Sequence, residues 1–213
     1  MNSTNLLATA GFGLIGTVVG ALGRHIVNRA LRSPVCRPPW CELACAGLSA
    51  LLGWRAAAGL LPSWWLPVPL VLGWFAVPLT AADLARRRLP DVLTLPAYPL
   101  IGLVVALAAT AGPDAGLGCR ALAGVILFGG AHALVRVLAP TAMGGGDVKL
   151  AGSLGAVLGA IGWPAMAVAA TLAAMGTALL AMARRMNHAP HGPSLLAATW
   201  LVAAFPGQLP GTG

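Results

Sequence analysis

Long apolar stretches separated by short polar segments dominate the chain. Eight such stretches lie at roughly 6–23, 43–61, 64–82, 95–112, 119–138, 148–161, 163–182 and 192–207. A helix needs about 20 apolar residues to cross a bilayer, and a segment in lipid must satisfy its own backbone hydrogen bonds. The pattern therefore predicts an all-α, polytopic membrane helical bundle with about eight transmembrane segments. The sixth and eighth stretches are short for a full span.

Composition supports a membrane protein. Hydrophobic residues make up 58% of the chain and charged residues only 8%, whereas soluble domains carry about a quarter charged residues. No linker divides the chain, so we expect a single integral membrane domain over 1–213, in contact with lipid. The net charge of +8 does not indicate nucleic-acid binding, because the basic residues fall in short connections between spans.

The distribution of basic residues predicts the orientation. Eleven of the thirteen lie in alternate connections, the exceptions being Arg55 and Arg120. Because cytoplasmic loops are enriched in Lys and Arg, these connections are expected in the cytoplasm and both termini outside. The first apolar stretch precedes its basic residues, so we interpret it as a retained span and not as a cleaved signal peptide. Trp64, Trp65 and Trp163 are then expected at the outer membrane interface.

Acidic residues are rare, and their placement is the main chemical signal. The chain has five of them, and three, Asp83, Asp91 and Asp147, fall at the cytoplasmic membrane boundary in this topology. An ionisable residue at the membrane is a candidate functional residue. Two neighbouring carboxyl groups share one proton, so one acts as acid and the other as base. Such a pair can activate water and protonate a leaving amine. Alternatively, Asp147 serves only as a helix cap.

Three glycines, Gly144, Gly145 and Gly146, directly precede Asp147. Glycine adopts backbone conformations that other residues avoid and permits close approach of another chain. A substrate bound in extended form beside the acid would need such a strip. A flexible turn between two helices would need glycine equally, so the glycines alone leave both interpretations open.

Two motifs resemble those of the type IV prepilin peptidases. The stretch "GGGDVKLAGSLGA" resembles the GxGD motif of that family, and "DLARRRLPDVLTLP" resembles its other aspartate motif. The first span, "GLIGTVVGALGRHIVNRAL", and the last, "HGPSLLAATWLVAAF", are similar to the corresponding spans of the family. The resemblance covers nearly the whole chain and implies a membrane aspartic peptidase of the GxGD type.

The resemblance also implies roles for individual residues. Asp83 and Asp147 correspond to the catalytic pair, and Asp91 falls where the family has Asp or Asn, which implies a supporting role. The resemblance implies that Gly144, Gly145, Gly146 and Lys149 shape the backbone of the active site or bind the substrate. Alternatively, Lys149 only extends its charged end to the membrane interface. No cofactor or metal is implied.

The implied reaction is removal of a basic leader peptide from a prepilin or pseudopilin, whose hydrophobic helix lies in the membrane. Cleavage would take place at the cytoplasmic face of a bacterial inner membrane. This location agrees with the depth inferred above for Asp83 and Asp147.

The first connection, at about 24–42, departs from many members of this family. Those members carry a larger cytoplasmic domain there, with two Cys-x-x-Cys pairs, and also N-methylate the new pilin terminus. Here Cys36 and Cys41 lack that spacing, Cys45 falls in the next span, and His25 is the nearest further ligand. We expect ordinary reduced cysteines, no zinc site, and a short form without methyltransferase activity.

Two other functions use the same acids. A proton-coupled transporter subunit would relay protons through them, but it predicts acids near the middle of the membrane or an inverted repeat of spans. A non-catalytic membrane scaffold would place no demand on Asp83 and Asp147.

Overall fold

A computed structural model describes residues 3–86, 89–140, 144–185 and 190–207. The described part contains eight α-helices and no strand, as the apolar pattern predicts. Their bounds are α1 Ser3–Ala30, α2 Trp40–Ala57, α3 Pro67–Arg86, α4 Asp91–Ala111, α5 Leu117–Leu138, α6 Gly145–Ile161, α7 Trp163–Arg184 and α8 Gly192–Ala204. Five of them, α1, α3, α4, α5 and α7, are long and apolar enough to cross a membrane. The chain is thus a multi-pass membrane protein with an all-helical fold.

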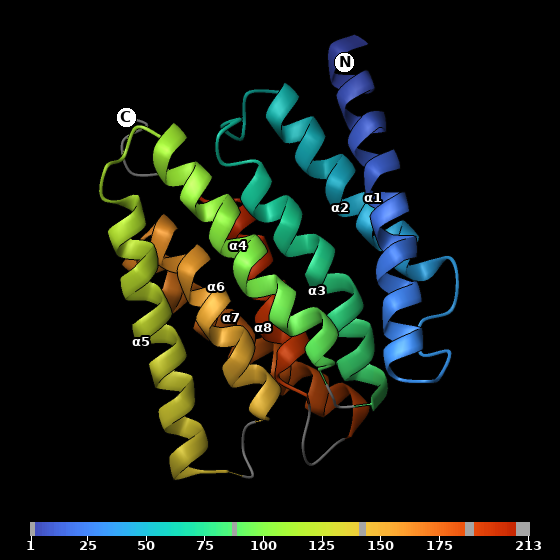
Figure 1. Cartoon of the computed structure of the whole chain (residues 1–213), viewed down its shortest axis with the longest axis vertical. Coiled ribbons are helices and arrows are strands. Elements are labelled where there is room, and N and C mark those ends of the chain that lie inside the picture. Colours follow the sequence, from blue (N-terminus) through green and yellow to red (C-terminus); the bar gives the residue numbers. More distant parts are fainter. Residues whose placement is uncertain (1–2, 87–88, 141–143, 186–189, 208–213) are drawn as a thin grey trace.

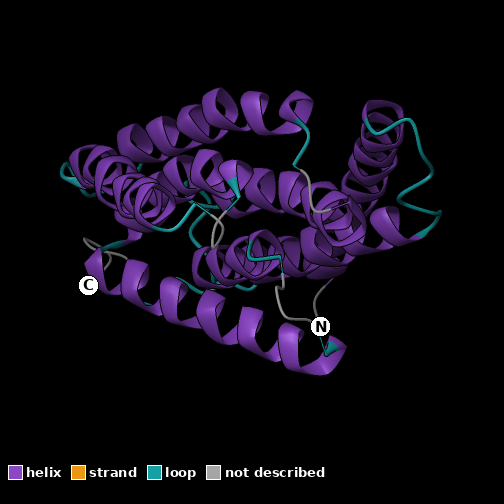
Figure 2. Cartoon of the chain, turned by 90° about the horizontal axis from the view of Figure 1, so that it is seen from below, coloured by secondary structure: helices purple, strands orange, loops and turns teal. Residues whose placement is uncertain are grey.

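Successive helices run up and down the bundle, and the N- and C-termini lie at the same end (Figure 1). Figure 2 shows the bundle from below, with the helices packed side by side and joined by loops. The lower end of Figure 1 holds the C-terminal ends of α1, α3, α5 and α7 and the N-terminal ends of α2, α4, α6 and α8. Side-chain contacts join elements at this end: the Arg86 guanidinium donates to Ser33 Oγ at 2.6 Å, and Lys149 Nζ lies 2.7 Å from Asp91 Oδ1.

Glycine contacts bring two pairs of helices into close approach. A Cβ on Gly124 of α5 would lie 2.1 Å from the carbonyl oxygen of Gly155 in α6. Likewise, Cβ atoms on Gly16 and Gly20 of α1 would lie 2.4 and 2.5 Å from backbone oxygens of α2. Small residues allow membrane helices to pack backbone against backbone. The close α5–α6 contact fixes the height at which α6 begins, and therefore the height of Asp147.

The α1–α2 connection differs from the expectation. Cys36 and Cys41 form a disulfide, so the prediction that both are reduced is wrong; Cys45 is free and buried. The Asn28 side chain helps to place Cys36 near Cys41, because it both donates to the carbonyl oxygen of Cys36 and accepts from the Cys36 N–H. These bonds hold Cys36 beside the start of α2. Within the described ranges, no three His, Cys, Asp or Glu side chains are grouped to hold a metal ion.

The tryptophan prediction is also wrong at one position. Trp65 is fully buried, and its indole N–H donates to the carbonyl oxygen of Ala203 at 2.9 Å. The turn before α3 folds inward onto α8, which removes this ring from the surface. Trp163 is half exposed, and its location at the outer interface stays a prediction.

We predict that Gly124→Ala destabilises the bundle. The added methyl would collide with the Gly155 carbonyl, and overpacking of this kind costs about 1–3 kcal/mol. Gly130→Ala, in the same helix, is the matched control, since a Cβ there meets no atom within 4 Å. Unfolding in detergent micelles measures both. Equal stability of the two variants would show that the α5–α6 contact is looser than described.

Candidate active site

Two helices deliver buried carboxyl groups to the lower end of the bundle. Asp83 lies in the last turn of α3 and is 6% exposed; Asp147 lies in the first turn of α6 and is 7% exposed. They are the only buried members of the five acidic residues. Burial of a carboxyl group is unfavourable unless neighbouring groups compensate. Asp83 and Asp147 are therefore the candidate catalytic side chains of the described region.

Gly192, the first residue of α8, brings the two carboxyl groups to one point. A Cβ built on it would lie 2.7 Å from Asp83 Oδ2 and 3.0 Å from Asp147 Oδ1. The two oxygens are therefore no farther apart than these two distances together. Any side chain larger than hydrogen at position 192 would occupy the space between them. We refer to Asp83 and Asp147 as the carboxyl pair.

Helix ends set the electrostatics of the carboxyl pair. Asp147 occupies the first turn of α6, and both carboxyl groups lie next to the first residue of α8, where a built Cβ would be 2.7 and 3.0 Å from their oxygens. The N-terminus of a helix carries partial positive charge from its unsatisfied N–H groups. Two helix N-termini thus favour a negative charge at this point. Asp83 is less favoured to carry it, because it lies near the C-terminal end of α3.

The two motifs identified in the sequence pack against each other. Leu89, which precedes Pro90 and Asp91, lies so close to Gly146 that a Cβ on the glycine would be 2.8 Å from Leu89 Cδ1. Gly144 accepts a hydrogen bond from the Asp147 N–H at 3.2 Å. A Cβ on Gly145 would lie 3.5 Å from the Arg136 guanidinium. The glycines therefore allow close packing around the start of α6.

Asp91 and Lys149 lie apart from the carboxyl pair. Their side chains are 61% and 48% exposed, and Lys149 Nζ contacts Asp91 Oδ1 at 2.7 Å. This exposed ion pair bridges the starts of α4 and α6. The Tyr98 hydroxyl adds a second bridge by donating to the carbonyl oxygen of Lys149. Lys149 thus has an acidic partner within the chain, and Asp91 has a role in joining two helices.

Sequence reasoning missed two histidines at this end. The rings of His132 and His191 have centroids 6.2 Å apart, and His132 is close enough to Asp147 to interact with it electrostatically. The Thr177 hydroxyl donates its proton to the Ala173 carbonyl, so at 2.9 Å it accepts from His191 Nδ1–H. Burial lowers the pKa of His191, and His132 adds to this. His191 is therefore neutral at pH 7. The dipeptide His191–Gly192 was the available signal, since Gly192 begins the last apolar stretch of the sequence.

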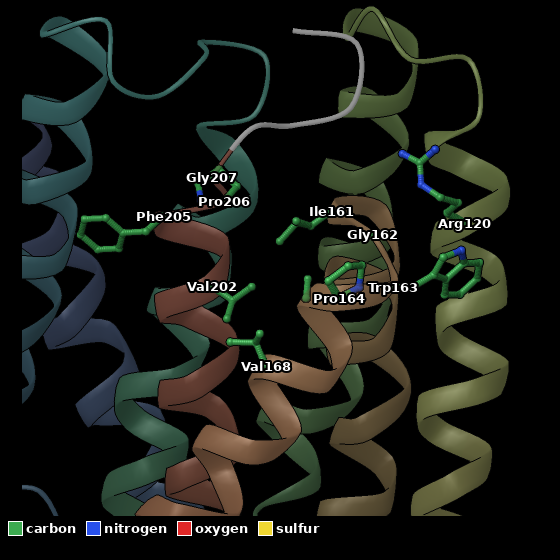
Figure 3. Close-up of a pocket in the computed structure, with 11 residues that line it drawn as sticks. Arg120, Ile161, Gly162, Trp163, Pro164, Val168, Val202, Phe205, Pro206 and Gly207 are labelled. Carbon is green, nitrogen blue, oxygen red and sulfur yellow. The ribbon is translucent and has the colours of Figure 1, made fainter. Parts of the chain in front are cut away.

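Two cavities lie in different parts of the bundle, one far from the carboxyl pair and one beside it. The pocket of about 560 Å³ in Figure 3 lies at the upper end, with Arg120 and Trp163 on one side and Phe205 on the other. None of its lining residues belongs to the carboxyl pair. A second cavity of about 530 Å³ reaches Leu84 and Pro193, the chain neighbours of Asp83 and Gly192. Of these two cavities among the described residues, the second adjoins the candidate site.

These observations define a class of protein, the multi-pass helical membrane protein with paired aspartates buried at one end of the bundle. The chain belongs to the type IV leader peptidase family, whose sequence profile matches residues 70–182. The matched range contains both members of the carboxyl pair.

Curated relatives carry one name, prepilin leader peptidase/N-methyltransferase. That of Aeromonas hydrophila is 34% identical over 188 residues, which cover 81% of this chain and 60% of the relative. That of Neisseria gonorrhoeae is 30% identical over 167 residues, covering 78% and 57%. That of Klebsiella pneumoniae is 36% identical over 145 residues, covering 65% and 58%. The chain therefore spans less than two thirds of the length of these relatives. No solved structure matches it.

Proposed function

We propose that this protein is an aspartic endopeptidase that removes the basic leader peptide from prepilins or pseudopilins. The observation that carries the proposal is the buried carboxyl pair, whose oxygens lie beside Gly192 at the end of a membrane bundle. Membership in the type IV leader peptidase family supports the substrate class. The names of the relatives support it as well.

In the proposed reaction one proton is shared by the carboxyl pair. The helix ends favour the negative charge on Asp147 and the proton on Asp83. Asp147 takes a proton from a water molecule as its oxygen attacks the scissile carbonyl carbon, and Asp83 protonates the carbonyl oxygen. The gem-diol intermediate then collapses: the C–N bond breaks, the proton on Asp147 passes to the leaving nitrogen, and one hydroxyl of the intermediate returns a proton to Asp83 as the carboxyl product forms. The pair returns to its starting state with one proton, so the cycle needs no metal or cofactor.

We further propose that the lower end of the bundle faces the cytoplasm of a bacterial inner membrane, with both termini outside. Basic residues gather at this end, at positions 29, 32, 37, 86, 136, 149 and 185. Positive charge in short loops favours the cytoplasmic side. The carboxyl pair at this end would then meet a leader peptide in the cytoplasm and a hydrophobic substrate helix in the membrane.

The third part of the proposal is cleavage without N-methylation, by a single domain over 1–213. Only residues 31–39 join α1 to α2, and an independently folded domain usually needs about 50 residues or more. The disulfide between Cys36 and Cys41 occupies two of the three cysteines in this region. We therefore assign the whole of the proposed chemistry to the carboxyl pair.

The carboxyl pair can be tested by charge removal. Asp83→Asn and Asp147→Asn should each reduce prepilin cleavage below detection, because an amide cannot exchange the proton that the reaction needs. Asp91→Asn should retain most activity, since the Asp91 side chain is exposed and hydrogen-bonds Lys149 and Thr94. Leader removal is followed by gel shift in membranes with equal amounts of each variant. Normal cleavage by either of the first two variants would remove that residue from the mechanism.

Gly192 offers a test of geometry. Gly192→Ala should lower kcat about 100-fold, because a displacement of catalytic groups by about 1 Å can have an effect of that size. The added methyl would push apart the two oxygens that it meets at 2.7 and 3.0 Å. Gly102→Ala, where a Cβ meets nothing within 4 Å, is the control and should retain full activity. Wild-type kcat in the Gly192→Ala variant would show that the pair does not meet at α8.

Orientation can be tested by labelling single cysteines with a membrane-impermeant maleimide. In a Cys119→Ser background, Ser63→Cys at the upper end should react in intact cells and Arg185→Cys at the lower end should not. Both residues are exposed. Arg87 and Gly211, at which the same contrast is expected from the sequence, lie outside the described residues. Reaction at position 185 from outside would place the carboxyl pair on the wrong side for a cytoplasmic leader.

A further inference from the structure

An apolar groove runs along α3 and ends beside the carboxyl pair. Its volume is about 530 Å³, and no charged side chain lines it. Because α2 and α8 both pack on α3, α3 forms the floor and the other two helices form the walls. We call it the α3 groove. Its lining includes Ala44 and Leu48 of α2, Ala76 and Thr80 of α3, and Ala197 and Leu201 of α8.

The lining positions follow the axes of the helices. On α3 they recur at Ala76, Thr80 and Leu84, and on α8 at Pro193, Ala197 and Leu201. A spacing of four residues keeps side chains on one helical face. The groove therefore runs parallel to α3 and α8 and extends for about 12 Å, or two turns, along α3.

The two ends of the α3 groove differ. At the upper end it is closed over Gly73, where a Cβ would lie 2.8 Å from the Trp200 indole nitrogen and 3.7 Å from Leu48 Cδ1. At the lower end Leu84 follows Asp83, and Pro193 follows Gly192. Whatever fills the groove therefore has its lower end beside the carboxyl pair.

We propose that the α3 groove binds the first turns of the hydrophobic helix of the prepilin substrate and so places the scissile bond at the carboxyl pair. This inference rests on the function proposed above. The peptide bond to be cleaved lies directly before the hydrophobic helix of such a substrate. A helix lying in the groove presents that bond at the lower end, where Gly192 leaves space between the two carboxyl groups.

Side-chain sizes favour a helix as the occupant. Four alanines, Ala44, Ala76, Ala81 and Ala197, line the groove. Small residues allow a second helix to approach backbone to backbone in a membrane, whereas a lipid chain gains no such contact. The short length of the groove fits the start of a helix, whose remaining turns would lie in lipid above the closure at Gly73.

Cross-linking tests occupancy without cleavage. The protein carries Asp147→Asn, to keep the substrate intact, and Cys119→Ser, to remove the exposed free thiol. Ala197→Cys in the groove is compared with Ala170→Cys, which is exposed on α7 outside the groove. The probe is a prepilin that the wild-type protein cleaves, with single cysteines along the first two turns of its hydrophobic helix. Disulfides are expected with position 197 and not with position 170.

Kinetics provide the second measurement. Ala44→Leu and Ala197→Leu, one from each wall, should each raise KM for the same prepilin about tenfold by filling the groove, with kcat nearly unchanged. Ala170→Leu should change neither constant. Equal cross-linking at positions 170 and 197, or unchanged KM in both groove variants, would overturn the docking proposal while cleavage itself stands. Failure of the wild-type protein to cleave any prepilin would instead overturn the proposed function.

Discussion

The structure depends on the burial of two carboxyl groups where three helix ends meet. Isolated charges are strongly disfavoured away from water, and a close pair cannot ionise fully. The N-termini of α6 and α8 supply the compensating partial charge. Gly192 makes this possible, because a Cβ at that residue would lie within 3.0 Å of an oxygen of each carboxyl group. The rest of the bundle sets the heights at which these helix ends occur.

Backbone-to-backbone packing controls those heights. In lipid there is little hydrophobic driving force between helices, so close packing of small residues determines how helices slide against one another. Gly124 and Gly155 fix α5 against α6, and the packing of Leu89 on Gly146 brings the α3–α4 connection onto the start of α6. The exposed ion pair between Asp91 and Lys149 adds little to stability by itself, as is usual for exposed pairs. Close packing at these glycines therefore sets the positions of the helix ends that carry the two aspartates.

The sequence predicts the fold well because membrane physics leaves few alternatives. Apolar length alone indicates the helices, and the expected stretch at 148–161 matches α6, Gly145–Ile161. The resemblance of the two motifs to those of a known family indicates Asp83 and Asp147, and in the structure an oxygen of each carboxyl group lies beside Gly192. That contact could not be predicted, because it depends on the tertiary position of α8. The same holds for His132 and His191, which come from elements far apart in the chain.

The two errors have a shared physical origin. Cys36 and Cys41 pair because Asn28 folds the connection back onto α2, and Trp65 is buried because the turn before α3 folds onto α8. The disulfide and the burial of Trp65 both depend on how a short connection folds. The pattern of apolar residues along the chain does not predict that folding. A transporter interpretation also loses support, since the buried acids lie at the end of the bundle and not at its middle.

The central claim is that Asp83 and Asp147 act as one unit. The most direct measurement compares single-turnover cleavage rates of Asp83→Asn, Asp147→Asn and the double variant, with enough enzyme to record residual activity. Residues that act together show losses that do not multiply. If the two aspartates act as one unit, the double variant is no slower than the slower single variant. A double variant slower by the product of the two separate losses would show that the two aspartates act independently, which would contradict the account.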